Sequence, residues 1–220
     1  MKKSLTVTLV IISVFVLCFS ACDTFKSTSI SFRAIDYTEE SFEELKSAIF
    51  SRLNCFYITD ENIIFNYDQN NQIFSIDISG HSLSDEEIDS LLSSNTLTFS
   101  NYKGDVFLDC KNVVSASLEY DSDLIYYYET DGSYVKLVLT EEGAELLKDA
   151  SREISTYKEP YNRYMNIKLG ADVIMSPLVS RVISTSEVQL AGDYTSKDAL
   201  NLATKISVSL IKLPFILVKN

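Results

Sequence analysis

The chain has 220 residues, of which 46% are hydrophobic and 23% charged, and its formal net charge is −12 at pH 7. That length fits one domain or two small ones. The excess of acidic side chains repels phosphate backbones and anionic lipid headgroups, which argues against nucleic acid as a partner.

The N-terminus has the three parts of a secretory signal. Met1 to Lys3 is positively charged, Leu5 to Phe19 is an uncharged apolar run, and small residues precede Cys22. The apolar run is short for a membrane-spanning helix, which needs about 20 residues. Small residues directly before a cysteine resemble the bacterial lipobox. We therefore expect 1–21 to be a signal peptide and Cys22 to be lipidated, with acyl chains such as palmitate; an uncleaved anchor is the alternative.

Loss of the signal removes two lysines and makes the remaining chain more acidic. The acyl chains, not a basic patch, must then hold the protein at the membrane. Residues 22–29 are expected to form a short polar stalk that keeps the folded part close to the extracytoplasmic face of the cell membrane.

Residues 30–104 alternate strands and helices. In chain order we expect a strand at 30–35, a helix capped by Thr38 and ending near Asn54, strands at 62–67 and 72–79, a helix opened by the capping box of Ser84 and Glu87, and a strand at 96–99. The order strand–helix–strand–strand–helix–strand is the split βαβ or ferredoxin-like arrangement.

Residues 105–212 are expected to form a second small unit. Its elements are strands at 113–119, 125–129 and 134–140, a helix at 141–157 capped by Thr140, strands at 165–169, 173–175 and 188–191, and a last helix capped by Thr195 with Asp198. Asp131-Gly132 is a strong hairpin signal between the strands at 125–129 and 134–140. Residues 213–220 add a strand that returns to the first unit. The predicted fold class is α+β with mostly antiparallel sheets.

Cys55 and Cys110 are the other cysteines outside the signal. In an oxidising compartment two such thiols favour a disulfide, which would contribute about 4 kcal/mol by closing a long loop. The alternative is two separate, half-buried thiols in a cell that lives without oxygen.

Catalytic motifs are not apparent in the sequence. His81 is the single histidine and lies in a Gly-His-Ser turn, and no Ser–His–acid set, glycine-rich phosphate loop or HExxH run occurs. Asp121, Asp123 and Asp131 lack the spacing of a calcium loop. We expect a protein that is not an enzyme and that has no cofactor or metal.

Three stretches resemble the head subdomain of the first periplasmic domain of SecD, an auxiliary of the Sec translocon. They are residues 135–144, 169–177 and 190–203, followed by Leu213-Pro214. Residues 30–104 are similar to the base of the same domain, through 32–36 and Arg52-Leu53, and the whole resemblance covers about residues 29–218. Two departures are mild: Gly170-Ala171 replaces an Asp-Gly turn, and Tyr194 replaces a phenylalanine.

The resemblance implies a base near the membrane and a head that touches unfolded polypeptide as it leaves the export channel. No apolar run of spanning length follows Leu213-Pro214. We therefore do not carry over the coupling of SecD to the proton gradient.

Two surface features are candidates for this role. Tyr126, Tyr127 and Tyr128 lie on a predicted strand, where alternate side chains face opposite sides, so at least one is expected to be exposed as part of a polypeptide-binding patch. The alternative is that they lie half-buried over a core. Gly104 is a candidate hinge between the two units, or a plain connecting turn.

We expect a lipid-anchored, extracytoplasmic protein that assists protein export or envelope protein folding by binding emerging or unfolded polypeptide. The Sec translocon is a candidate partner. The alternative is a lipoprotein that reuses the fold to bind a specific envelope partner or a host molecule.

Overall fold

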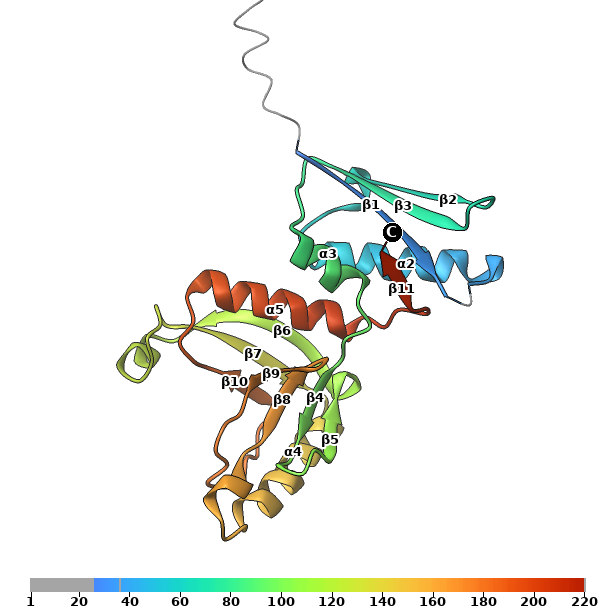
Figure 1. The fold of residues 1–220 in the computed structure, drawn as a ribbon. Helices are drawn as coiled ribbons and strands as arrows, with labels where there is room; N and C mark the ends of the chain where they lie inside the picture. The colour runs from blue at the N-terminus through green and yellow to red at the C-terminus, as the bar shows by residue number, and fades with distance from the viewer. Residues whose placement is uncertain (1–25, 36, 220) are drawn as a thin grey trace, which may run out of the picture.

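The computed structural model describes residues 26–35 and 37–219, and the structural statements below concern those residues. They form two units, each built around its own hydrophobic core. Figure 1 shows the first unit above the second, with helix α5 between them. None of the described helices is both long and apolar enough to cross a bilayer.

The first unit is a four-stranded antiparallel sheet with two helices on one face (Figure 1). Its elements are β1 (Ser27–Ala34), α2 (Phe42–Asn54), β2 (Ile63–Asp68), β3 (Ile73–Ser79), α3 (Asp85–Leu92) and β11 (Leu217–Lys219). The strand order β11-β1-β3-β2 is that of the predicted ferredoxin-like arrangement. Buried side chains alternate along the two central strands, so that Ile30 and Phe32 of β1 face the helices together with Ile76 of β3.

The fourth strand of this sheet is not the one that we predicted. Residues 96–99 were expected to complete the first unit, but the strand formed there, β4 (Leu97–Ser100), pairs with β8 of the second unit. Leu97 and Phe99 are fully buried in the core of the second unit. The fourth position is filled by β11, which pairs antiparallel with β1.

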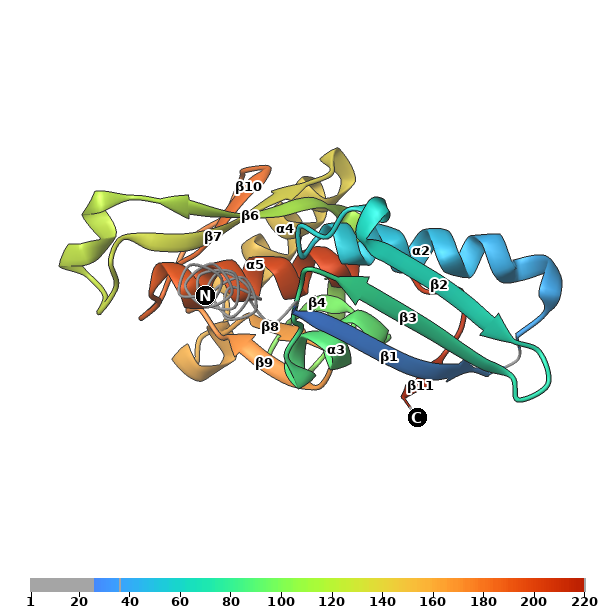
Figure 2. The same cartoon turned by 90° about the horizontal axis from the view of Figure 1, so that it is seen from above.

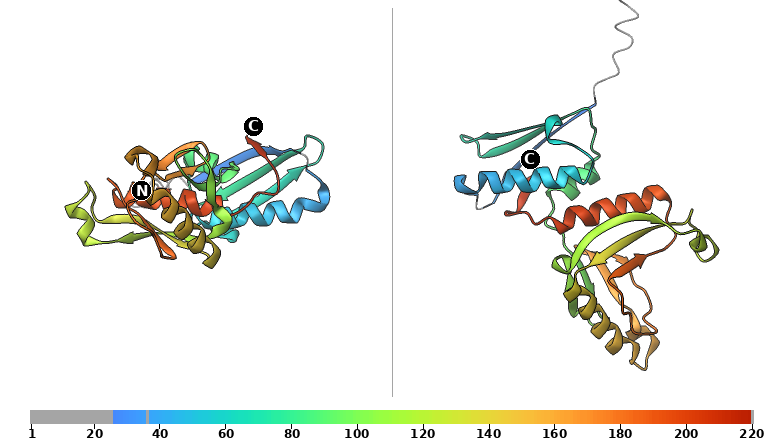
Figure 3. Two further views of the ribbon diagram at one scale, coloured as in Figure 1. Left: turned by 90° about the horizontal axis from the view of Figure 1, so that it is seen from below. Right: turned by 180° about the vertical axis from the view of Figure 1, so that it is seen from behind.

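The second unit contains two antiparallel sheets and two helices. Its elements are β4, β5 (Val106–Asp109), β6 (Val113–Tyr120), β7 (Ser133–Leu139), α4 (Glu141–Ser155), β8 (Asn166–Leu169), β9 (Asp172–Met175), β10 (Glu187–Leu190) and α5 (Ser196–Leu210). One sheet has the order β10-β7-β6 and the other β5-β4-β8-β9. Helix α5 packs along β6 and β7, which Figure 3 shows from behind. The fold is α+β, as predicted.

Three helix starts follow the capping residues read from the sequence. Ser84 and Glu87 form the predicted capping box of α3, Thr195 and Asp198 form that of α5, and the Thr140 side chain accepts a hydrogen bond from the backbone N–H of Gly143. Thr38 differs. A short 3-10 helix (η1, Glu39–Ser41) follows it and delays α2 to Phe42, and the Thr38 side chain makes no capping bond.

Residues 27–29 of the predicted polar stalk belong to β1, which begins at Ser27 and pairs there with Ser79, whereas residues 22–25 lie outside the described residues. Thr28 is buried, and its hydroxyl donates to the carbonyl of His81 and accepts from the N–H of Leu83. These bonds and the pairing with β3 include residues 27–29 in the folded first unit.

Candidate functional site

The tyrosines at 126–128 lie in the segment that joins β6 to β7, which we call the tyrosine loop (residues 121–132). The predicted strand at 125–129 is wrong: residues 122–126 form a 3-10 helix (η4, Ser122–Tyr126). The Asp121 side chain caps this turn by accepting from the N–H of Asp123 at 2.9 Å, and Leu124 is buried beneath it. β7 therefore pairs with β6, and the loop lies at the end of that hairpin (Figure 2).

The tyrosine loop presents aromatic rings to solvent. Tyr126 is 83% exposed, Tyr127 78% and Tyr128 42%, and Tyr120 at the end of β6 is 64% exposed. The alternation of a strand predicts that at least one of the three tyrosines is exposed, whereas the exposure of all three results from a turn anchored by the buried Leu124. Contiguous exposed aromatic groups with polar neighbours are typical of protein interaction surfaces.

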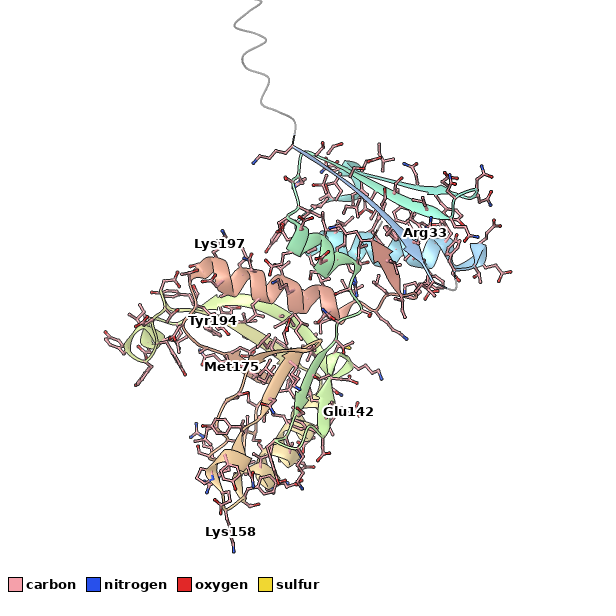
Figure 4. The ribbon with its side chains drawn as sticks, in the orientation of Figure 1. Arg33, Glu142, Lys158, Met175, Tyr194 and Lys197 are labelled. Atoms are coloured by element: carbon pink, nitrogen blue, oxygen red, sulfur yellow. The ribbon has the colours of Figure 1, made fainter. Side chains whose placement is uncertain are left out.

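The return end of the tyrosine loop is bonded to the segment that begins α5. The backbone N–H of Glu129 donates to the Asp193 carboxylate at 3.0 Å, and the Thr130 hydroxyl donates to the carbonyl of Tyr194 at 2.5 Å. Asp131 accepts from the N–H and the hydroxyl of Ser196 at 2.8 and 2.6 Å. Figure 4 labels Tyr194 and Lys197, which mark this end of α5.

Hydrogen bonds from Ser133 and Ser196 lower the pKa of Asp131 well below its ordinary value. Gly132 completes the turn with a φ of +97°, and a Cβ there would lie 2.9 Å from the carbonyl oxygen of Asp121. The backbone at the return end of the tyrosine loop is therefore held in place, next to the exposed rings.

A buried arginine joins the two units where the chain crosses between them. Arg52 on α2 is 2% exposed. Its guanidinium donates to the carbonyls of Leu91 and Ser93, each at 2.7 Å, where the chain leaves the first unit. It also donates two bonds, of 3.0 and 2.7 Å, to the carbonyl of Ile211, where the chain returns to the first unit. Burial lowers the pKa of Arg52 to about 10, so the group stays charged at neutral pH.

The role of Arg52 was missed by sequence reasoning, although one signal was available. Arg52 stands directly beside Leu53 in a helix whose buried stripe also contains Leu45 and Ile49. A charged residue next to such a stripe is unusual unless its hydrogen bonds are satisfied.

Gly104 does not lie between the units. It has a φ of +90° in the turn that joins β4 to β5, and its N–H donates to the carbonyl of Asn101 at 3.0 Å. Both strands belong to one sheet of the second unit, so Gly104 forms a plain connecting turn, which was the alternative to a hinge. The chain crosses between the units at Ser93 and Ile211 instead.

Cys55 and Cys110 are free thiols in the structure, so the predicted disulfide is not formed. Cys55 follows α2 in the first unit, whereas Cys110 begins a 3-10 helix (η3, Cys110–Asn112) in the second. Burial raises the pKa of both thiols. Cys22, the predicted lipidation site, lies outside the described residues.

A cleft of about 480 Å³ separates the first unit from α5. Its lining includes Tyr57 and His81 from the first unit and Lys197 and Thr204 from the second. The ammonium of Lys205 pairs with Glu86 across the interface. Within residues 26–35 and 37–219, no group of three or more His, Cys, Asp or Glu side chains is placed to hold a metal ion.

The family model of the SecDF P1 head subdomain matches residues 89–210 of the chain. No curated protein shows a significant sequence match. A solved structure described as SecDF in a super-membrane-facing form superposes with a TM-score of 0.61 at 16% identity, over 100% of this chain and 35% of that chain.

A second solved structure, described as a membrane component SecDF that enhances protein export, superposes with a TM-score of 0.57 at 15% identity. That superposition covers 87% of this chain and 97% of the other. Identities this low show likeness of fold, and the chain spans only about a third of the length of the first structure.

Proposed function

Because the chain belongs to the family of the SecDF P1 head subdomain, we propose that it is a non-catalytic accessory of protein export. In this proposal it binds emerging or unfolded polypeptide on the extracytoplasmic side of the membrane. The proposal also makes the Sec translocon a candidate partner. Binding and release of a chain need no chemical step.

One observation carries the proposal: the exposed aromatic rings of the tyrosine loop. Tyrosine and tryptophan give a large contact area at low cost in conformational entropy, and they are enriched in protein interfaces. Hydrogen bonds of Thr130 and Asp131 to residues 194 and 196 hold the backbone at the return end of the tyrosine loop before a partner arrives. Preorganisation of this kind reduces the entropic cost of binding.

The proposal places the first unit next to the membrane. Lipidation of Cys22 would leave only a few residues before β1 begins at Ser27, and an extended chain spans at most about 3.6 Å per residue. The first unit would then be the base, with β11 returning to it, and the second unit the head. The tyrosine loop would belong to the head.

Site-specific photocrosslinking in living cells tests the proposal. A photoreactive amino acid replaces Tyr127 in the full chain, and the matched control replaces Tyr161, which is 67% exposed at a distant position of the second unit. We expect adducts from position 127 with many secreted polypeptides or with the export channel, and few from position 161.

Three outcomes would count against the proposal. A single discrete adduct from position 127 to an unrelated envelope or host protein would mean that the fold serves a specific partner instead. Equal adducts from both positions would indicate nonspecific contact. The absence of any adduct at position 127 would remove the tyrosine loop as the binding surface.

A further inference from the structure

Strand β6 forms one edge of the three-stranded sheet β10-β7-β6, and no strand among the described residues pairs with its outer side. The direction of its backbone groups follows from two hydrogen bonds. Asp121, just after the strand, donates its N–H to the carbonyl of Gly132 at 2.8 Å, toward β7. The carbonyl of Ala116 instead accepts from the hydroxyl of Ser207 on α5 at 3.2 Å, so it points away from β7.

Antiparallel strands alternate residues that bond the neighbouring strand with residues whose N–H and C=O point the other way. Because the backbone of Asp121 bonds toward β7, this alternation directs the backbone groups of Ser117 and Glu119 toward β7 as well. The backbone groups of Leu118 and Tyr120 then point to the outer edge. A register irregularity between Val113 and Ser115 ends the regular edge at the other side. Among the described residues no hydrogen bond engages the outer backbone groups of Leu118 and Tyr120, so these groups can pair with an added strand.

A groove of about 450 Å³ runs beside this edge. Its walls include Leu118 on β6, Leu200 and Thr204 on α5, and Tyr57 from the turn that follows α2. Tyr57 is 74% exposed and has a φ of +61°, a left-handed conformation that a tyrosine rarely adopts. The cost of that conformation is of order 1 kcal/mol, and such positions are concentrated at functional sites.

The charged side chains near the outer edge of β6 indicate which polypeptide segments would bind there. Residues 113–135 contain five acidic side chains and no lysine or arginine: Glu119, Asp121, Asp123, Glu129 and Asp131. Lys136 lies just beyond and pairs with Glu119 at 3.2 Å. The end of the edge nearest the tyrosine loop therefore carries net negative charge, which favours segments that carry lysine or arginine.

We propose that the outer edge of β6 binds an extended, positively charged polypeptide segment by adding it as a fourth strand to the β10-β7-β6 sheet. The main-chain bonds would form at Leu118 and Tyr120, and alternate side chains of the segment would enter the groove beneath Tyr57. The inference rests on the proposed function, because it assigns the site at which the unfolded polypeptide is held. The tyrosine loop lies at the end of this edge and would continue the contact surface (Figure 2).

The test measures binding of a short fluorescent peptide that alternates valine with lysine or threonine to the full chain in detergent, by fluorescence anisotropy. The variant Tyr120→Pro removes one outward N–H and leaves the ladder to β7 intact, because proline is tolerated at such edge positions. The matched control Tyr120→Ala removes the ring and keeps the N–H. Circular dichroism and the Tm establish that both variants are folded.

We expect Tyr120→Pro to raise the Kd about tenfold and Tyr120→Ala by less than about threefold. The same peptide with N-methylated central amides should not bind. If Tyr120→Pro and Tyr120→Ala bind alike, or the N-methylated peptide binds as well as the parent, strand addition is wrong while polypeptide binding stands. If the wild-type chain binds neither peptide, the proposed function fails along with this inference.

Discussion

At the scale of single residues, Arg52 connects the two units. Its hydrogen bonds reach the end of α3 at Leu91 and Ser93 and the residue after α5 at Ile211. The carbonyls at helix C-termini carry partial negative charge, so a buried cation is favourable there without a carboxylate partner. Arg52 thereby fixes both crossings of the chain relative to α2.

Replacement of Arg52 by methionine should destabilise the protein by about 3 kcal/mol, because three backbone carbonyls lose their donors while the apolar stem is retained. Urea unfolding of the full chain measures the effect. Arg33, labelled in Figure 4, is exposed on β1 and serves as the control. Arg33→Met should change the free energy of unfolding by less than about 0.5 kcal/mol. Equal losses in the two variants would show that Arg52 is not a specific clamp.

Tyr57 should be replaceable by glycine with a gain in stability of up to about 1 kcal/mol, because glycine adopts a positive φ without steric cost. Gln72 has a φ of +54° in an exposed turn and is the matched control. Both Tyr57→Gly and Gln72→Gly should raise the Tm, but only Tyr57→Gly should weaken peptide binding. A lowered Tm for Tyr57→Gly would contradict the interpretation that its backbone is strained.

At the scale of elements, the helices were predictable and the tyrosine loop was not. The caps Ser84, Thr140 and Thr195 are local signals, since a side chain bonds a backbone N–H a few residues away. The Asp131-Gly132 pair also marks a real turn, but it was assigned to the wrong strands. Bonds from residues 129–131 to residues 193–196 hold the segment in place, and no local pattern reveals partners so distant in sequence.

The attachment of the tyrosine loop to α5 should depend on pH through Asp131. Its pKa is lowered in the folded chain by bonds from Ser133 and Ser196, so the folded carboxylate holds a proton less tightly than the unfolded one. The resulting stabilisation is present above the ordinary pKa of 3.8 and is lost as the pH falls through the folded value.

Asp131→Asn should therefore lower the Tm at pH 7, and the difference from wild type should shrink progressively below pH 4. Asp123→Asn, in the same loop and exposed, is the control. Thermal unfolding followed by circular dichroism from pH 7 to pH 3 measures both variants. A difference between wild type and Asp131→Asn that stays constant over this range would contradict the assigned role of the carboxylate.

At the scale of the whole molecule, the second unit is inserted into the first, between α3 and β11. The sheet order β11-β1-β3-β2 is complete only when the chain returns after α5. Residues 97–100 and 217–219 are both short strands, and periodicity cannot tell which one joins β1. Residues 97–100 join the second unit because Leu97 and Phe99 are buried in its core and pair with β8. The sequence therefore predicts the fold class, most elements and the return of the C-terminal strand to the first unit, but it assigns residues 96–99 to the wrong unit.

The central claim, that the chain assists protein export through the tyrosine loop, is tested most directly by pulse-chase labelling of secreted proteins in cells that lack it. We predict slowed appearance of labelled proteins outside the cytoplasm. The wild-type chain should restore the rate, whereas a variant with Tyr126→Ser and Tyr127→Ser, folded and present at the same level, should not. An unchanged export rate in cells without the chain would contradict the account.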